Sequence, residues 1–123
     1  MSKYEIIAEE VTKRIFREDP TLIERYGERG RNQTFIDNMH HLDYLKTAME
    51  LNTSKIFTDY ALWLRGILIK YGMTTQTLID NFLFLEEELE KCTVVESEIS
   101  SAYIGLLGEA VSILRDVQGG EAQ

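Results

Sequence analysis

The most apolar stretch of the chain runs Lys55-Ile-Phe-Thr-Asp-Tyr-Ala-Leu-Trp-Leu-Arg-Gly-Ile-Leu-Ile-Lys-Tyr71. Its large apolar side chains recur three and four residues apart, which is the period of an α-helix, and they cover roughly half of the helix circumference. These side chains are Ile56, Phe57, Tyr60, Trp63, Leu64, Ile67, Leu68 and Tyr71. A helix with so much apolar surface has to pack against several others, so this stretch predicts a helical bundle.

Helical periodicity continues on both sides of this stretch, and we find no convincing two-residue alternation typical of a strand. Asp19-Pro20 marks one boundary, and the glycines of Gly27–Gly30 indicate a joint between two helices. We therefore predict an all-α fold, a single compact bundle of about five to six helices with globin-like packing as a variant. Residues 1–118 form the domain and residues 119–123 a frayed tail. The flanking helices are expected at Tyr4–Arg17, Pro20–Tyr26, Gln33–Leu51, Thr77–Lys91 and Ser97–Val117.

Composition limits the classes of function. The 123 residues include 13 Lys and Arg against 21 Asp and Glu, and the resulting net charge of −8 argues against a nucleic-acid partner. No apolar run approaches the roughly 18 residues of a membrane span, and the N-terminus has no signal-peptide pattern. Cys92 is the single cysteine, which excludes an internal disulfide and suits the reducing cytoplasm. We expect a cytoplasmic protein.

The sequence offers little for catalysis or metal binding. Asp37 and His40 have the spacing of half a di-iron site, but the second Glu-x-x-His motif that such a site needs is missing. One cysteine and two adjacent histidines are also a poor ligand set for zinc. No nucleophile elbow, phosphate-binding loop or dinucleotide fingerprint occurs. We expect no metal site, no cofactor and no enzymatic activity.

His41 has two interpretations. It projects between Leu45 and Ala48, at the edge of the apolar face, where an imidazole is most often hydrogen-bonded within the core. Alternatively, it could ligate a tetrapyrrole, either haem or cobalamin. In that alternative, Arg29 or Arg31 meets the propionates, and the cleft is lined by Met39, Phe57, Tyr60 and Trp63.

Two further groups of residues are candidates for binding. In Tyr26-Gly-Glu-Arg-Gly-Arg31, the arginines could clamp an anionic ligand or a partner's carboxylate, although pairing with the chain's own acids is favoured. Leu62 and Ile69 lie seven residues apart, roughly opposite the main apolar stripe, with Gly66 on the same flank. These three residues and Phe84 are candidates for a dimer interface, and burial under the helices 4–17 and 97–117 is an equally good explanation.

Residues 26–64 also carry a resemblance. Tyr26-Gly-Glu-Arg-Gly-Arg31, Thr34, Asp37-Asn38, His41-Leu42-x-Tyr44-Leu45 and Phe57-x-Asp59-Tyr60-x-x-Trp63-Leu64 resemble helical modules of bacterial sensory proteins, which are found ahead of cobalamin-binding or other regulatory domains. The resemblance extends over about residues 4–91 and implies sensing or protein–protein regulation rather than catalysis. We expect no cobalamin-binding module with its own ligand histidine beside it.

We therefore predict a non-catalytic bacterial sensor or regulatory module that forms a homodimer and contacts another regulatory protein. The alternative is a tetrapyrrole-binding protein that uses His41. Candidate ligand- or partner-binding residues are Tyr26, Glu28, Arg29, Arg31, His41, Tyr44, Tyr60 and Trp63.

Overall fold

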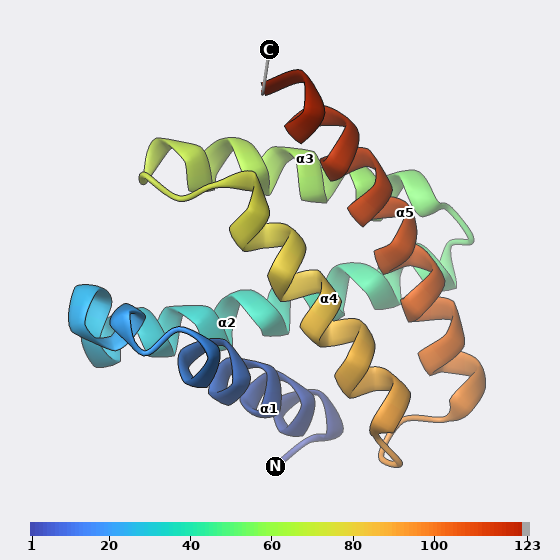
Figure 1. The fold of residues 1–123 in the computed structure, drawn as a ribbon. Coiled ribbons are helices and arrows are strands. Elements are labelled where there is room, and N and C mark those ends of the chain that lie inside the picture. The colour runs from blue at the N-terminus through green and yellow to red at the C-terminus, as the bar shows by residue number, and fades with distance from the viewer. Residues whose placement is uncertain (122–123) are drawn as a thin grey trace.

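Five α-helices form the chain in a computed structural model that describes residues 1–121 (Figure 1). There is no strand among these residues, so the prediction of an all-α bundle is confirmed. The helices are α1 (Lys3–Glu18), α2 (Thr21–Glu50), α3 (Ser54–Lys70), α4 (Thr75–Lys91) and α5 (Ser97–Glu121).

Local sequence signals set several helix ends. Ser2 and Glu5 form a capping box at the start of α1, in which the Ser2 hydroxyl accepts from the Glu5 amide and the Glu5 carboxylate accepts from the Ser2 amide. The Thr74 hydroxyl accepts in the same way from the Thr77 amide at the start of α4. Gly72, with a φ of +82°, follows the end of α3 in a conformation that favours glycine.

The two helices expected at 20–26 and 33–51 form one element, α2, with a kink at Gly27. Gly27 has a φ of +64° and a ψ of −163°, a conformation that favours glycine. The expected four-residue joint is therefore wrong, because the helix resumes directly after Gly27 and includes Gly30. A Cβ on Gly30 would lie 2.3 Å from the Cβ of Tyr26, so the second glycine allows the chain to fold back closely at the kink.

All five helices contribute side chains to one core. α4 packs against α5 and α1, and crosses in front of α2 in Figure 1, while α5 crosses α3 and packs against it. Phe57, Phe82 and Tyr103 are the largest fully buried side chains. Each large apolar side chain removed from water stabilises the fold by roughly 1.5–3 kcal/mol. This core holds α2 and α3 next to each other, where the candidate site lies.

α5 is longer than predicted. It was expected to end near Val117, but it continues through Gly119 and Gly120 to Glu121. The Glu121 carboxylate pairs with Arg65 of α3 and accepts a hydrogen bond from the Thr75 hydroxyl at 2.9 Å. These contacts explain why residues 119–121 are helical instead of part of the expected frayed tail. The rest of that prediction, at residues 122 and 123, lies outside the described residues.

Candidate functional site

A shallow groove of about 300 Å³ lies between α2 and α3. We call it the aromatic groove, and it is lined by Tyr44 of α2 and by Ile56, Asp59, Tyr60 and Trp63 of α3. The four α3 residues are spaced at i, i+3, i+4 and i+7, so helical geometry alone places them on one side. Trp63 is 60% exposed and Tyr44 is 42% exposed, which is unusual for such large side chains.

Tyr60 connects this groove to the core. Its ring stacks on Tyr44 with a centroid distance of 4.0 Å and an interplanar angle of 13°, and its centroid lies 6.3 Å from that of Trp63. Its hydroxyl lies 2.6 Å from Nδ1 of His41, a side chain that is only 1% exposed. The imidazole stands edge-on to Phe82, with 5.1 Å between the ring centroids. The buried His41 thus holds Tyr60 in place beneath the groove.

Burial controls the ionisation of this pair. Desolvation, followed by the charge of His40, lowers the pKa of His41 to about 3, so its imidazole is neutral at pH 7. Desolvation, followed by the charges of Asp37, Tyr44 and Asp43, raises the pKa of the Tyr60 hydroxyl above its usual range. A neutral phenol beside a neutral imidazole makes an ordinary buried hydrogen bond. It supplies neither a charged nucleophile nor a positively charged acid.

His41 therefore has the environment of the hydrogen-bonded core histidine, the first of its two interpretations. Tyr60 occupies its Nδ1, and the rings of Tyr60 and Phe82 stand edge-on against the imidazole. Phe57, expected to line a tetrapyrrole cleft, is fully buried in the core. A flat macrocycle would reach this imidazole only after these rings had moved.

A pair of hydrogen-bonded amides near His41, Asn38 and Asn81, was not predicted from the sequence. The Nδ2 of Asn38 donates to the Oδ1 of Asn81 at 3.1 Å, and the Nδ2 of Asn81 donates to the Oδ1 of Asn38 at 2.7 Å. Asn38 is completely buried and also donates to the carbonyl of Thr34. A signal was present, because Asn38 occupies a position on the apolar stripe of α2 that leads through Leu42 and Leu45. This pair joins α2 to α4.

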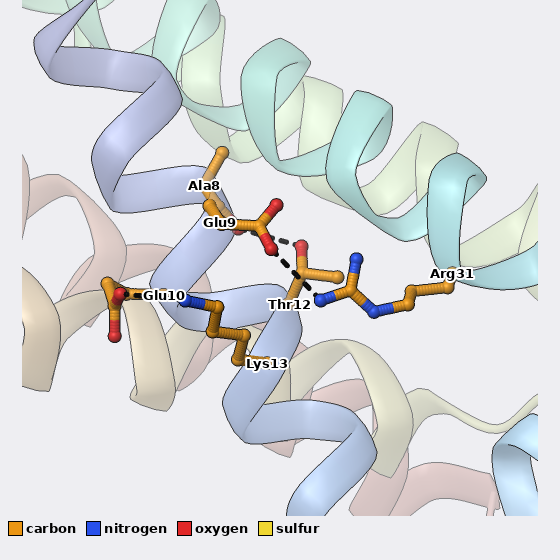
Figure 2. A network of polar contacts seen from close by, with 6 residues as sticks. All are labelled: Ala8, Glu9, Glu10, Thr12, Lys13 and Arg31. Atoms are coloured by element: carbon orange, nitrogen blue, oxygen red, sulfur yellow. Dashed lines mark hydrogen bonds and ion pairs between the residues drawn. The ribbon is translucent and has the colours of Figure 1, made fainter. Parts of the chain in front are cut away.

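The arginine-rich corner at the kink of α2 is separate from the groove. Arg31 reaches across to α1 and pairs with Glu9 at 2.9 Å, as Figure 2 shows. The Arg25 guanidinium lies over the ring of Tyr26, 5.2 Å from its centroid. Glu28 and Arg29 are exposed. Tyr44 follows Arg29 by 15 positions on one helix, which is about 22 Å along its axis.

The candidate dimer residues also separate into two places. Leu62 and Ile69 are 37% and 42% exposed, and a Cβ on Gly66 would meet nothing within 4 Å. Phe84 lies on α4 instead, where the Arg14 guanidinium covers its ring at 4.5 Å from the centroid. Phe84 is therefore packed within the chain. We use the term α3 face for the outward surface formed by Asp59, Leu62, Trp63, Gly66, Ile69 and Lys70.

Neither a metal centre nor a membrane span is found in residues 1–121. No cluster of three or more His, Cys, Asp or Glu side chains there could hold a metal ion. None of the helices described has the length and apolar character needed to cross a bilayer.

Comparisons of the chain with protein-family models, with curated proteins and with solved structures found no match.

Proposed function

We propose that this chain is a non-catalytic regulatory module that acts as a homodimer, with the α3 face as the contact between two copies. The observation that carries the proposal is the exposure of large apolar side chains on one helix: Leu62, Trp63 and Ile69 all face outward from α3. Exposed apolar surface that is contiguous, rather than scattered, is typical of an interaction site.

The chemistry of the groove favours binding over catalysis. Its lining includes one carboxylate, Asp59, and the adjoining histidine is buried, neutral and hydrogen-bonded. Catalysis by a nucleophile or by an acid–base pair needs at least two reactive groups within hydrogen-bond reach of a substrate. The resemblance of residues 26–64 to helical modules of bacterial sensory proteins supports a regulatory role as well.

Cys92 is a free cysteine, in keeping with a cytoplasmic location.

A second copy is the occupant that fits the α3 face best, because the face carries a negative charge at one end and a positive charge at the other. Asp59 lies near the start of α3 and Lys70 at its end, with Leu62, Gly66 and Ile69 between them. A two-fold interface brings the same patch of two subunits together, so a patch has to be complementary to itself. An apolar centre with an acid at one end and a base at the other meets this condition.

Sedimentation velocity over a range of micromolar concentrations tests this proposal. We expect a dimer for the unmodified chain, and a monomer with an unchanged circular dichroism spectrum for Leu62→Glu and for Ile69→Glu. Ile23→Glu is the matched control, since Ile23 is 40% exposed and lies outside the α3 face. A monomeric parent chain, or a dimer that resists both α3 substitutions, would contradict the proposal.

A further inference from the structure

The six residues of the α3 face are arranged in two rows around Gly66. At 100° per residue, all of them lie within about 60° of the direction of Gly66. Asp59, Trp63 and Lys70 fall on one flank of that direction. Leu62 and Ile69 fall on the other. One flank of the α3 face is therefore charged and aromatic, and the opposite flank is aliphatic.

The two flanks of one copy are complementary to those of a second copy when the two α3 helices run antiparallel and cross at Gly66. A two-fold axis of that kind keeps each flank opposite the same flank of the second copy. With a rise of about 1.5 Å per residue, Leu62 lies about 6 Å before Gly66 and Ile69 about 4.5 Å after it. Leu62 of one copy is then almost level with Ile69 of the other. Gly66, whose Cβ position is open, allows the two backbones to approach.

On the other flank, the same register brings a lysine to the aromatic groove. Lys70 lies about 6 Å after Gly66, while Trp63 lies about 4.5 Å and Asp59 about 10.5 Å before it. The second copy's Lys70 is therefore level with Trp63 and within side-chain reach of Asp59. Lys70 is exposed, and it forms no ion pair among residues 1–121.

The groove offers a cation both an aromatic face and negative charge. An ammonium over an exposed tryptophan is attracted by the ring's quadrupole. Asp59 lines the groove, and the carboxylates of Asp37 and Asp43 are close enough to act on Tyr60 electrostatically. The one lysine paired there is Lys55, which contacts Asp59 at 2.5 Å in an exposed ion pair of low strength.

We propose that two copies of the chain pack antiparallel through α3, and that Lys70 of each copy enters the aromatic groove of the other, between Trp63 and Asp59. This inference rests on the proposed homodimer and specifies its register. It also makes each groove incomplete in an isolated copy, since the cation that fills it belongs to the other copy.

Charge reversal tests the pairing of Lys70 with Asp59. In sedimentation experiments we expect Lys70→Glu to weaken the dimer about tenfold or more, because it places like charges together. The double substitution Asp59→Lys with Lys70→Glu should restore much of the lost affinity by reversing the pair. Lys46→Glu is the control, because Lys46 is another exposed lysine and lies on α2, outside the α3 face.

Cysteine crosslinking tests the register separately. In a Cys92→Ser background, Gly66→Cys should form a disulfide between two copies, since position 66 lies at the proposed axis. Ile69→Cys should not, because an antiparallel crossing at Gly66 separates the two copies of position 69 by about 9 Å along the helices. A parallel dimer would crosslink at both positions.

The outcomes separate the two proposals. A parent chain that stays monomeric overturns both the homodimer and the register. If Leu62→Glu dissociates the dimer but Lys70→Glu does not affect it, the homodimer proposal stands and the proposed position of Lys70 is overturned. A double substitution that restores nothing also overturns the pairing, and so does crosslinking at position 69.

Discussion

The hydroxyl of Tyr60 lies 2.6 Å from Nδ1 of His41, so a side chain that lines a surface groove is anchored by one that is almost completely buried. The hydrogen bond joins α3 to α2. It also explains how the groove keeps its shape, because the Tyr60 ring supports both Tyr44 and Trp63. Substitutions at either end of this bond should therefore affect stability as well as the surface.

Tyr60→Phe should destabilise the folded chain by about 1–3 kcal/mol, because it leaves a buried imidazole nitrogen without its partner. Urea denaturation followed by circular dichroism measures this difference. Tyr44→Phe is the matched control, since Tyr44 is an exposed tyrosine of the same groove. Equal stabilities of the Tyr60→Phe variant and the parent would show that the His41–Tyr60 bond contributes nothing.

The folded chain should lose stability as the pH falls below 6.5. The pKa of His41 is lowered to about 3 in the fold from an ordinary value of 6.5, so the unfolded chain binds a proton in this range and the folded chain does not. The free energy of unfolding decreases as the pH falls wherever the unfolded state binds more protons than the folded state. From pH 7 to pH 5, this group alone should cost about 2 kcal/mol.

The pH prediction can be checked by urea denaturation across that range and by NMR. His40→Gln should keep the dependence on pH, because His40 is exposed and its removal leaves the buried imidazole in place. In an NMR titration of the folded chain, the His41 ring should show no titration step near pH 6.5. A step there for the His41 ring would mean that His41 is accessible to protons.

Gly30→Ala should destabilise the chain by about 1–3 kcal/mol, as expected for an extra methyl group in a space that has no room for it. The added Cβ would lie 2.3 Å from the Cβ of Tyr26. Gly105→Ala provides the control, because a Cβ there meets nothing within 4 Å and the residue lies inside α5. That change should stabilise by about 0.5–1 kcal/mol. Thermal unfolding of both variants measures the contrast.

Haem or cobalamin added to the purified chain should not remain bound in stoichiometric amount. The reason is that Tyr60 and Phe82 enclose the imidazole of His41. Absorbance between about 300 and 700 nm after gel filtration detects retained pigment. A stoichiometric band that His41→Ala abolishes would instead make the chain a tetrapyrrole-binding protein. His41→Ala without pigment, compared by circular dichroism, controls for loss of the fold.

Most of the helical architecture could be predicted from periodicity, because the apolar stripes that define each helix are local features of the sequence. The kink was harder. Gly27 was correctly expected between two helical segments. The immediate resumption of the helix after Gly27, however, depends on the close approach of Tyr26 to Gly30. The final turn of α5 likewise depends on Arg65 and Thr75, which are distant in sequence.

The candidate site was predictable only in parts. Tyr60 and Trp63 share one helix, so their common face follows from spacing, but the stacking of Tyr44 on Tyr60 requires the packing of α2 against α3. The Asn38–Asn81 pair joins residues 43 positions apart and could not be paired from the sequence. The separation of Arg29 and Arg31 from the groove could not be predicted from the sequence either. It follows only from the finding that one uninterrupted helical stretch leads from Glu28, after the kink, to Tyr44.

The exposure of Trp63 decides what optical spectroscopy can report about this molecule. Trp63 is the only tryptophan, and 60% of it faces solvent in the folded chain. Its fluorescence in the isolated chain should already be close to that of a water-exposed indole, so unfolding will change the emission wavelength little. A blue shift will instead signal that something has covered the groove. The chain thus carries its own reporter of contact, positioned where the proposed second copy would arrive.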